Sequence, residues 1–483
     1  MSEVLKNLEP KDVFYYFEEI CNIPHGSGNV EKISNYLVDF AKKRNLEVYQ
    51  DEVKNVIIIK EASNGYEAEE PVIIQGHMDM VAVKKPDCNI DMKKEPLRLA
   101  IDGDNIYAEG TSLGGDDGIA VAYALALLDS DVYAHPRLEV VITVDEETGM
   151  NGARAIDLSM LKGHRMLNID SEEEGIFLTS CAGGARIDCC LPVKREKVKG
   201  RVYNVTISGL QGGHSGCEID KERGNSNSLC GRMLTELGRK VSYRLVSIGG
   251  GLADNAIPRE TALQIIVWEN EGTFEDAIRF FEQKIKKELE TKEPDFCVIV
   301  EKGELSETEA FSEESNRRAV QLLEALPNGI QAMSLDVKGL VETSLNMGIV
   351  STNEQEMQIE ISVRSSIESA KEALIHKVET VTELCGGRTV VSGEYPGWSY
   401  RKDSPLRDTA IRVYREMYGK EPEIQAIHAG LECGILAEKI SDLDCVSLGP
   451  DMKNIHTTEE TLSISSAKRV WEFCLEVLKQ KKK

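Results

Sequence analysis

The chain has 483 residues, of which 41% are hydrophobic and 29% charged, and its formal net charge is −25. Its length exceeds the size at which one hydrophobic core usually stops growing, so we expect two domains. The strong negative charge repels phosphate backbones and argues against nucleic acid as a partner.

Hydrophobic segments are short throughout the chain. No apolar run approaches the roughly 18 residues that a membrane helix needs. The N-terminal segment MSEVLKNLEPKD is charged and lacks a signal-peptide core. We therefore expect a cytoplasmic protein with no membrane partner. The twelve cysteines show no C-x-x-C spacing, which is typical of buried thiols in a cytosolic chain.

The first part of the chain begins with helical patterns and continues with strands. Apolar residues at three- and four-residue spacing predict amphipathic helices over 10–22 and 30–44. Short β-branched runs then predict strands over 46–51, 55–60 and 71–77, and the last is apolar enough to be central.

Strands and helices alternate after this. Residues 82–110 indicate an irregular connection with one strand, and a helix near 118–129 is apolar on nearly every side, which predicts that it is buried. Strands are predicted over 138–144 and 165–170. This alternation is typical of an α/β layer architecture.

The pattern changes from about residue 187, where strands with alternating burial are followed by amphipathic helices in two rounds. The second round has helices near 313–326 and 368–384 and strands near 331–350 and 356–364. We expect two similar α+β units in tandem, although no sequence repeat demonstrates duplication.

The last part of the chain, residues 404–483, returns to the first style, with helices at 405–418 and near 464–480 and a strand at 444–450. The simplest organisation is a discontinuous α/β domain, with a mixed central sheet flanked by helices, that is interrupted by an inserted α+β domain. The predicted segments are 1–186 and 395–483 for the α/β domain and 187–394 for the insertion.

Five short segments place an acid or a histidine just beyond an apolar strand or at the start of a helix. In open α/β sheets such strand ends converge on one crevice. Histidine and carboxylate without cysteine suit zinc or another divalent transition metal. Five ligands are too many for one tetrahedral zinc ion, and one carboxylate that bridges two metals would accommodate them. The candidates are His77, Asp116, Glu147, Asp170 and His456.

The order and wording of these segments resemble the co-catalytic dinuclear zinc peptidases, a family that includes glutamate carboxypeptidase, aminoacylase and the bacterial dipeptidases. The resemblance runs from about residue 10 to the end and rests on GHMDMV, LGGDDGIA, TVDEETGMNGA, NIDSEEEG, SCAGG and GP-x5-H. It implies a metallopeptidase that hydrolyses dipeptides, Xaa-His and other Xaa-Xaa dipeptides among them, with the inserted domain as a lid over the catalytic domain.

The resemblance also implies two Zn²⁺ ions, with Co²⁺ or Mn²⁺ as alternatives. One metal would be held by His77 and Asp170, the other by Glu147 and His456, with Asp116 bridging both. Two metals can share a water and lower its pKa. The family often has a cis peptide after its bridging aspartate, which makes Asp116–Asp117 a candidate.

Two further acids have implied roles beside the metals. Asp79 would orient His77, as carboxylates often orient metal-bound histidines. Glu146, next to the ligand Glu147, would be the general base that takes a proton from water and passes it to the leaving amine. An acidic trio such as Asp145–Glu147, taken alone, would favour a solvated turn, and the other four segments change that interpretation.

The lid domain carries its own matches to the family. His214 in GLQGGHSG and Asn255 in DNAIPR would stabilise the oxyanion. Arg364 in ISVRSS would bind the terminal carboxylate of the substrate. His428 and Glu432 in IHAGLECG lie where the family lines its substrate pocket. The resemblance leaves open whether His214 acts within its own chain or across a homodimer formed through the lid domain.

Two other functions remain open at this point. An amide hydrolase of the same scaffold could act on N-acyl amino acids. A catalytically silent assembly protein could retain the metal ligands alone, but the presence of Glu146 beside Glu147 argues against it.

Overall fold

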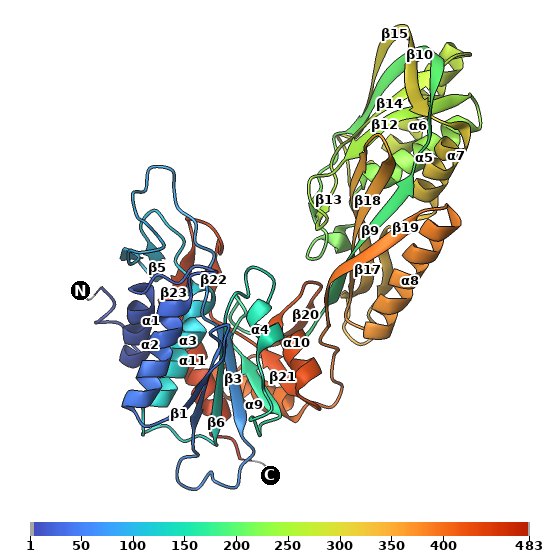
Figure 1. Ribbon diagram of the computed structural model, residues 1–483. Coiled ribbons are helices and arrows are strands. Elements are labelled where there is room, and N and C mark those ends of the chain that lie inside the picture. The colour runs from blue at the N-terminus through green and yellow to red at the C-terminus, as the bar shows by residue number, and fades with distance from the viewer. Residues whose placement is uncertain (1–3, 482–483) are drawn as a thin grey trace. The chain divides into compact units, whose positions relative to one another are not determined.

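The computed structural model describes residues 4–481, so that the first three residues of the charged N-terminal segment and the last two of the chain lie outside the described part (Figure 1). The chain divides into two compact units, called unit 1 and unit 2 here. Unit 1 comprises residues 1–180, 400–426 and 431–483, and unit 2 comprises residues 181–399 and 427–430. Within the described residues, no helix is long and apolar enough to cross a membrane.

Unit 1 is built on an eight-stranded mixed sheet. In spatial order its strands are β1 (Glu47–Gln50), β2 (Val56–Lys60), β6 (Leu138–Thr143), β3 (Val72–His77), β7 (Arg165–Asn168), β21 (Asp444–Ser447), β8 (Ile176–Cys181) and β20 (Glu423–Ile427). The block from β6 to β21 is parallel, whereas β1, β2 and β8 pair antiparallel with their neighbours. The side chains that follow β3, β6 and β7 are therefore delivered to one edge of the sheet.

Helices cover both faces of this sheet (Figure 1). One face forms the large hydrophobic core together with α1 (Lys11–Cys21), α2 (Glu31–Lys43), α3 (Gly115–Asp129), α9 (Pro405–Tyr418) and α11 (Ile464–Leu478). The other face carries α4 (Asn151–Ala155) and α10 (Glu432–Lys439). The predicted α/β class, with a mixed central sheet flanked by helices, is confirmed. As its uniformly apolar sequence predicts, α3 is buried along nearly its whole length.

A small second sheet in unit 1 differs from the sequence prediction. It contains β22 (Met452–Lys453), β23 (Thr461–Ser463), β5 (Asn105–Ala108) and β4 (Leu99–Asp102). One strand was expected in the segment 82–110, but the chain forms the hairpin β4–β5, and β5 then pairs with β23 from the end of the chain. The second strand was missed because β5 is four residues long and only its pairing with β23 completes it.

Unit 2 contains one nine-stranded sheet. Eight strands follow the order β15 (Cys297–Phe311), β10 (Arg195–Ser208), β14 (Thr261–Val267), β12 (Tyr243–Gly250), β17 (Val341–Thr352), β18 (Glu356–Ser365), β9 (Gly183–Pro192) and β19 (Arg388–Tyr395), and β16 (Gly329–Met333) pairs with β17. The two rounds expected from the sequence share this sheet, because Gly250 of β12 pairs with Val350 of β17.

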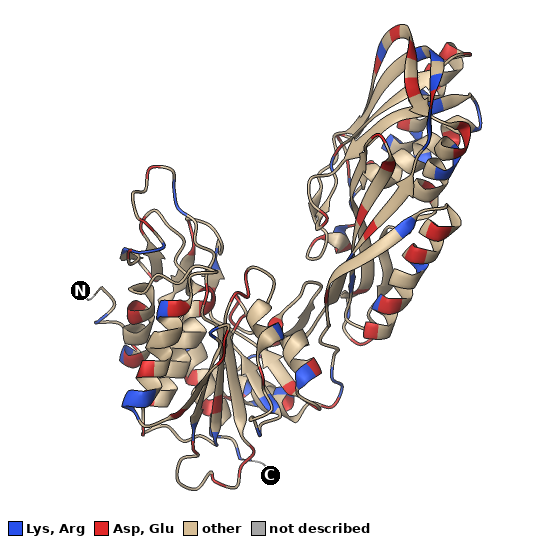
Figure 2. Cartoon of the chain, in the orientation of Figure 1, with Lys and Arg blue, Asp and Glu red and all other residues tan. Residues whose placement is uncertain are grey.

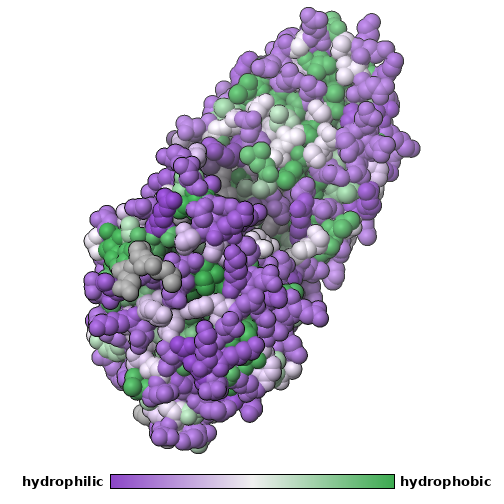
Figure 3. All heavy atoms as spheres, turned by 60° about the vertical axis from the view of Figure 1, so that its left-hand side comes forward, coloured by the Kyte–Doolittle hydropathy of each residue, from purple (hydrophilic) through white to green (hydrophobic). Residues whose placement is uncertain are grey.

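Helices and short elements complete unit 2. They are α5 (Ser226–Gly238), α6 (Glu271–Glu288), α7 (Glu313–Ala325), α8 (Glu368–Leu384), the 3-10 turn Ile219–Lys221 and the strand pair β11 (Gly213–His214) and β13 (Ala256–Ile257). Their apolar sides form one core with the sheet. Figure 2 shows acidic and basic residues interspersed along β10, β15 and α8. The molecular face in Figure 3 is mostly hydrophilic, as the charged composition leads us to expect.

Candidate metal centre

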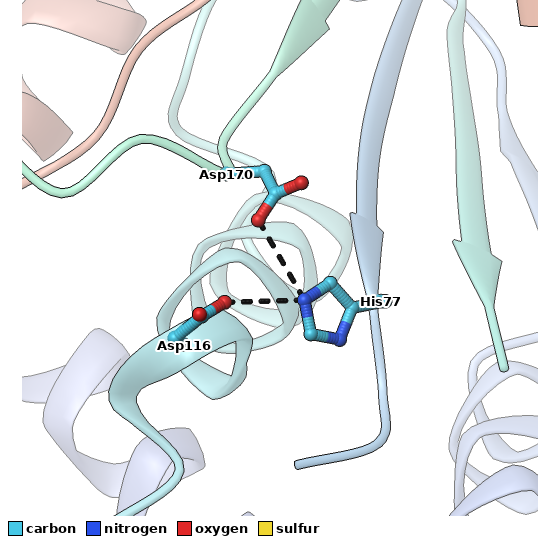
Figure 4. A group of neighbouring side chains, drawn as sticks. All are labelled: His77, Asp116 and Asp170. Carbon is cyan, nitrogen blue, oxygen red and sulfur yellow. Dashed lines mark hydrogen bonds and ion pairs between the residues drawn. The ribbon is translucent and has the colours of Figure 1, made fainter. Parts of the chain in front are cut away.

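His77 lies at the end of the buried central strand β3, where its imidazole faces two carboxylates (Figure 4). Its Nε2 atom is 3.1 Å from Asp116 Oδ1 and 3.6 Å from Asp170 Oδ1. The other nitrogen, Nδ1, lies 3.0 Å from the backbone carbonyl of Asp79. Since a carbonyl can only accept, Nδ1 carries a hydrogen, and Nε2 is the atom that faces the carboxylates.

Asp116 stands at the start of α3 and presents its two oxygens to two different histidines. Oδ1 faces His77, and Oδ2 lies 3.1 Å from Nε2 of His456. His456 Nε2 is also 2.9 Å from Glu147 Oε1. The peptide bond between Asp116 and Asp117 is cis, which confirms that prediction.

The structure thus brings all five predicted ligands together in two groups that share one residue. His77, Asp116 and Asp170 form the first group, and Asp116, Glu147 and His456 the second. Within each group the ligand atoms lie within 4.8 Å of one another. An imidazole nitrogen with carboxylate oxygens is a donor set that suits zinc and other divalent transition metals.

The charges of the cluster favour a cation at its centre. Hydrogen bonds to Asp116 and Glu147 raise the pKa of His456 to about 10. Burial alone would lower the pKa of His77, but hydrogen bonds to Asp116, Asp170 and Asp79 raise it well above its usual value. The carboxylates therefore stabilise positive charge at this place, which a proton or a divalent metal ion can supply. The residues present fit bound metal ions.

Local packing explains why the segment before His77 ends in glycine. A Cβ atom at Gly76 would lie 2.4 Å from Asp117 Oδ2 and 2.6 Å from Ala120 Cβ, so no larger residue fits there. The close approach lets the backbone N–H of His77 donate to Asp117 Oδ2 at 3.1 Å. β3 and the start of α3 are thereby held together where each carries a candidate ligand.

Asp79 connects the first group to the turn that carries Glu146. Its Oδ1 atom accepts the backbone N–H of Glu146 at 3.1 Å and lies 3.5 Å from His77 Nδ1. Its Oδ2 atom accepts from the Ser27 hydroxyl at 2.8 Å. The turn is further fixed by Asp145, whose Oδ1 accepts the backbone N–H of Gly28 at 2.6 Å.

Glu146 is half-buried beside the acids of the cluster. Burial, opposed by the nearby His77 and assisted by the negative charges of Asp170 and Glu432, raises its pKa to about 9. Cations bound nearby would lower this pKa again, because opposite charge favours the ionised form. Glu146 belongs to neither ligand group, so its carboxyl group differs from that of Glu147 in its contacts.

Glu460 is a buried acid that the sequence analysis missed. Its carboxylate accepts the backbone N–H groups of Leu113 at 2.8 Å, Gly114 at 3.1 Å and Gly115 at 2.8 Å. It thus holds the turn that leads directly into Asp116. The signal in the sequence was weak, since Glu460 is one acid in the polar run TTEET after His456.

Four of the residues predicted to act on the substrate belong to unit 2, and two of them, His214 and Asn255, lie beside each other. β11 pairs with β13, so that His214 lies opposite Ala256 and next to Asn255. His214 Nδ1 accepts the backbone N–H groups of Gly216 at 3.1 Å and Cys217 at 3.0 Å. Nδ1 therefore bears no hydrogen, and the neutral ring offers its Nε2–H as a donor. Burial lowers the pKa of His214, and the charge of Arg364 lowers it further.

Arg364 and His428 are both buried in unit 2. Arg364 donates to the Tyr395 hydroxyl at 3.1 Å, and its Nε atom is buried with no hydrogen-bond partner among the described residues. His428 Nε2 is 2.7 Å from the Ser344 hydroxyl, and burial together with the charge of Arg364 lowers its pKa to about 4. Arg364 carries a positive charge and His428 lies close to it, so this region suits an anionic group.

Glu432, which the sequence predicts to line a substrate pocket, lies at the start of α10 in unit 1. Its side chain is 0% exposed there. Its carboxylate accepts from Gln75 and Thr143, which are side chains of the central sheet. The carboxylate is therefore enclosed by side chains of the sheet.

Three ligands follow the strands of a parallel block, and the shared aspartate at the start of α3 joins them to a second histidine. Such a pair of histidine–carboxylate groups is the arrangement of a metal-dependent hydrolase. The chain belongs to peptidase family M20/M25/M40, whose model matches residues 73–480. The predicted enzyme class, a metallopeptidase with a catalytic domain and a lid domain, is confirmed by this membership and by the relatives below.

Two relatives match the chain over nearly its full length. The cytosol non-specific dipeptidase of Escherichia coli (strain K12) is 36% identical over 483 residues, covering 99% of each chain. The crystal structure of aminoacylhistidine dipeptidase from Vibrio alginolyticus superposes with a TM-score of 0.95 at 36% identity, over 100% of this chain and 99% of that one. Aminopeptidase PepT from Bacillus cereus shares the fold, with a TM-score of 0.57 at 16% identity over 98% of both chains.

Proposed function

We propose that the protein is a dipeptidase that holds two divalent metal ions, zinc in the first place, and hydrolyses Xaa-His and other Xaa-Xaa dipeptides. The observation that carries this proposal is Asp116, whose two oxygens each face a different histidine at 3.1 Å. The dipeptidase names of the two full-length relatives support the choice of substrate.

Five residues are proposed to hold the metals. His77 and Asp170 bind the first ion and Glu147 and His456 the second, with Asp116 shared between them. Two such ions would lower the pKa of water and polarise the scissile carbonyl. The hydrogen bond from His77 Nδ1 to the Asp79 carbonyl keeps Nε2 directed at its ligand position.

Glu146 is proposed to be the general base. Its side chain is not tied up in either ligand group, and the bond from its backbone N–H to Asp79 fixes the turn that carries it. The carboxylate can therefore take a proton from the attacking water and deliver it to the departing amine. With cations bound nearby, this carboxyl group would stay ionised at neutral pH against the effect of burial.

The unit 2 residues are proposed to bind the substrate. The Nε2–H group of neutral His214 is a hydrogen-bond donor of the kind that stabilises an oxyanion, and Asn255 next to it can add a second. Arg364 has a buried Nε–H without a partner, which suits the terminal carboxylate of a dipeptide. His428, held by Ser344, lines the same positively charged region.

Acids near the ligand groups favour a dipeptide over an N-acyl amino acid as the substrate. Desolvation and the negative charges of Asp116 and Asp170 raise the pKa of Glu172 to about 7, so its carboxyl group lies close to the acids of the ligand groups. Glu173 follows it in the sequence. Acids that are not needed as ligands favour a cationic group, and a dipeptide has an α-ammonium group where an N-acyl amino acid has none.

A substrate panel tests this proposal. Xaa-His and other dipeptides, tripeptides and N-acetyl amino acids would be compared by kcat/KM with the zinc-loaded protein. We expect free dipeptides to be the best substrates, whereas preference for the acetylated series would favour the N-acyl alternative. Absence of all hydrolysis would favour the silent assembly protein.

The role of Arg364 is tested with the same substrates. We expect Arg364→Met to raise KM for free dipeptides by about 10–100-fold, because a hydrogen bond to a charged group contributes about 1.5–3 kcal/mol. C-terminally amidated dipeptides should lose much less. Arg388→Met, at a 61% exposed arginine of the same unit, is the matched control. An equal loss for free and amidated substrates would contradict carboxylate binding.

The homodimer through the lid domain stays a prediction. Light scattering of the full chain would give the oligomeric state. If the protein is a dimer, mixing a His214→Ala variant with a Glu146→Gln variant would show whether His214 acts across subunits, since activity would then return in the mixed dimer.

A further inference from the structure

The carboxyl group of Glu432 has an unusual environment for a group outside the proposed ligands. The side chain is 0% exposed, at the first residue of α10. Its Oε1 atom has no hydrogen-bond partner among the described residues. Burying a carboxylate is costly unless other groups compensate it, so a simple packing role would be served better by an apolar residue.

Glu432 takes part in a chain of short hydrogen bonds that crosses three strands. Its Oε2 atom accepts from Thr143 Oγ1 at 2.5 Å and from Gln75 Nε2 at 2.6 Å. Gln75 Oε1 in turn accepts from Asn168 Nδ2 at 2.6 Å. Because Thr143, Gln75 and Asn168 belong to β6, β3 and β7, one carboxylate connects the ends of three neighbouring strands.

The pleat of the sheet explains why these polar residues meet under α10. Val72, Ile74, Val140, Ile142 and Leu167 point into the large core on the opposite face. Side chains alternate along a strand, so the residues between and after them face α10. Gln75 pairs with Asn168 across β3 and β7, and His77 pairs with Thr143 across β3 and β6. The final α10-facing position of each strand is therefore polar.

Each strand of this network leads within three residues to a residue of the proposed active site. Gln75 precedes His77 by two residues, Thr143 precedes Glu146 by three, and Asn168 precedes Asp170 by two. Glu432 and Asp170 also interact electrostatically, since burial and the negative charge of Asp170 raise the pKa of Glu432 to about 7. A substitution of Glu432 would therefore alter the positions of all three strand ends together.

We propose that Glu432 is a positioning residue, which fixes the ends of β3, β6 and β7 relative to one another and thereby sets the placement of His77, Glu146 and Asp170. The inference rests on the proposed function, since it assigns Glu432 a role in that same reaction. It contacts neither substrate nor metal. Substitution of residues that orient metal-bound side chains typically lowers metal affinity or activity by about 10–100-fold.

The test uses three variants of the full chain, assayed for dipeptide hydrolysis, zinc affinity and thermal unfolding. Glu432→Met keeps the length of the side chain and removes its acceptors. We expect it to lower kcat or zinc affinity by about 10–100-fold while leaving KM for the dipeptide unchanged. Glu432→Gln keeps one acceptor for Gln75 and Thr143 and should restore most of the loss. Thr143→Val removes one donor at nearly constant volume and should give a smaller loss of the same kind.

The matched control is Glu139→Gln. Glu139 is also 0% exposed, lies on the same face of β6 four residues before Thr143, and accepts the backbone N–H groups of Lys162 at 3.0 Å and Gly163 at 2.9 Å. Its substitution should lower the unfolding temperature and leave kcat and zinc affinity unchanged. Equal kinetic losses in Glu139→Gln and Glu432→Met would reduce the role of Glu432 to general stability.

Two results would overturn the inference while leaving the proposed function intact. Wild-type dipeptide hydrolysis combined with normal kcat and zinc affinity in Glu432→Met would show that the network does not position the site. A raised KM with normal kcat in this variant would instead indicate that Glu432 contacts the substrate. If Glu432→Met does not fold, Glu432→Gln and Thr143→Val decide by the same readouts. Lack of hydrolysis in the wild type would instead contradict the proposed function.

Discussion

The adjacent residues Glu146 and Glu147, which follow the strand β6, have side chains in different surroundings. Glu147 Oε1 is 2.9 Å from His456 Nε2, whereas Glu146 is fixed through its backbone N–H to Asp79 and its carboxyl group joins neither ligand group. The divergence begins at Asp145, whose φ of 54° lies in the left-handed region and turns the chain sharply. Neighbours in sequence can therefore serve a metal and a proton separately.

This difference predicts opposite phenotypes for the two residues. Glu146→Gln should lower kcat by about 10²–10⁴-fold, the usual contribution of general acid–base catalysis, with zinc content retained. Glu147→Gln should lower zinc content first, because it removes a ligand oxygen. Metal analysis and steady-state kinetics on both variants check this. Retained zinc in Glu147→Gln, or normal turnover in Glu146→Gln, would contradict the assignment.

At the residue scale, the predictable parts of the site are those where short motifs carry the chemistry. The five candidate ligands could be named from their positions beyond a strand or at the start of a helix, and the structure brings them into two groups. Glu460 and the contacts of Glu432 were not predictable in this way. Both depend on backbone N–H groups or side chains that are distant in sequence, such as Leu113 for Glu460 and Thr143 for Glu432.

The turn before α3 is the element whose position depends most on one distant side chain. Gly114 has a φ of 70°, and a Cβ atom there would lie 2.8 Å from Met80 Sδ, so glycine is required. The N–H groups of this turn point at Glu460, which is contributed by the loop between β22 and β23. The position of Asp116 thus depends on an element from the end of the chain.

Substitution of Glu460 tests this dependence. Glu460→Ala leaves at least three backbone N–H groups without their acceptor, so we expect stability to fall by about 1.5–3 kcal/mol or more, together with zinc affinity. Glu459→Ala is the matched control, because Glu459 is exposed and pairs with Lys85 at 2.6 Å. Denaturant unfolding and zinc titration measure the two effects. Equal effects of the two substitutions would contradict the proposed support of Asp116.

Most elements were predictable because their apolar periodicity is strong. The helix predicted over 368–384 matches α8, and the strand predicted over 138–144 differs from β6 by one residue. Pairing was harder to predict. The segment near 331–350, for which strand structure was predicted, forms β16 and β17, which pair with each other. Local patterns reveal the period of a strand and give no information about its partner.

At the scale of the whole molecule, the proposed ligands all belong to unit 1, whereas unit 2 supplies the proposed substrate contacts. The predicted boundaries at 186/187 and 394/395 lie a few residues from the breaks between the two units. The return of residues 427–430 to unit 2 was not expected, since the sequence there shows no change of pattern.

This division predicts that metal removal acts on one unit. Chelation should destabilise unit 1, since a ligand at 1,000 times its Kd stabilises the folded state by about 4 kcal/mol. Trp471 reports on unit 1, and Trp268 and Trp398 report on unit 2. A variant that retains only Trp471 should show a lower unfolding temperature in EDTA, and one that retains only Trp268 should change little. Equal shifts in both variants would show that the units unfold together.

The strand order of unit 1 also links its completion to the order of synthesis. β7 and β8 are separated by only a short loop in the chain, yet β21 lies between them in the sheet. The strand that fills this place is made after the whole of unit 2, and His456 follows it by nine residues. At about 5–20 residues per second, the interval between Asp170 and His456 lasts roughly 15–60 s. A nascent chain therefore has its first ligand group long before its central sheet and second ligand group can be complete.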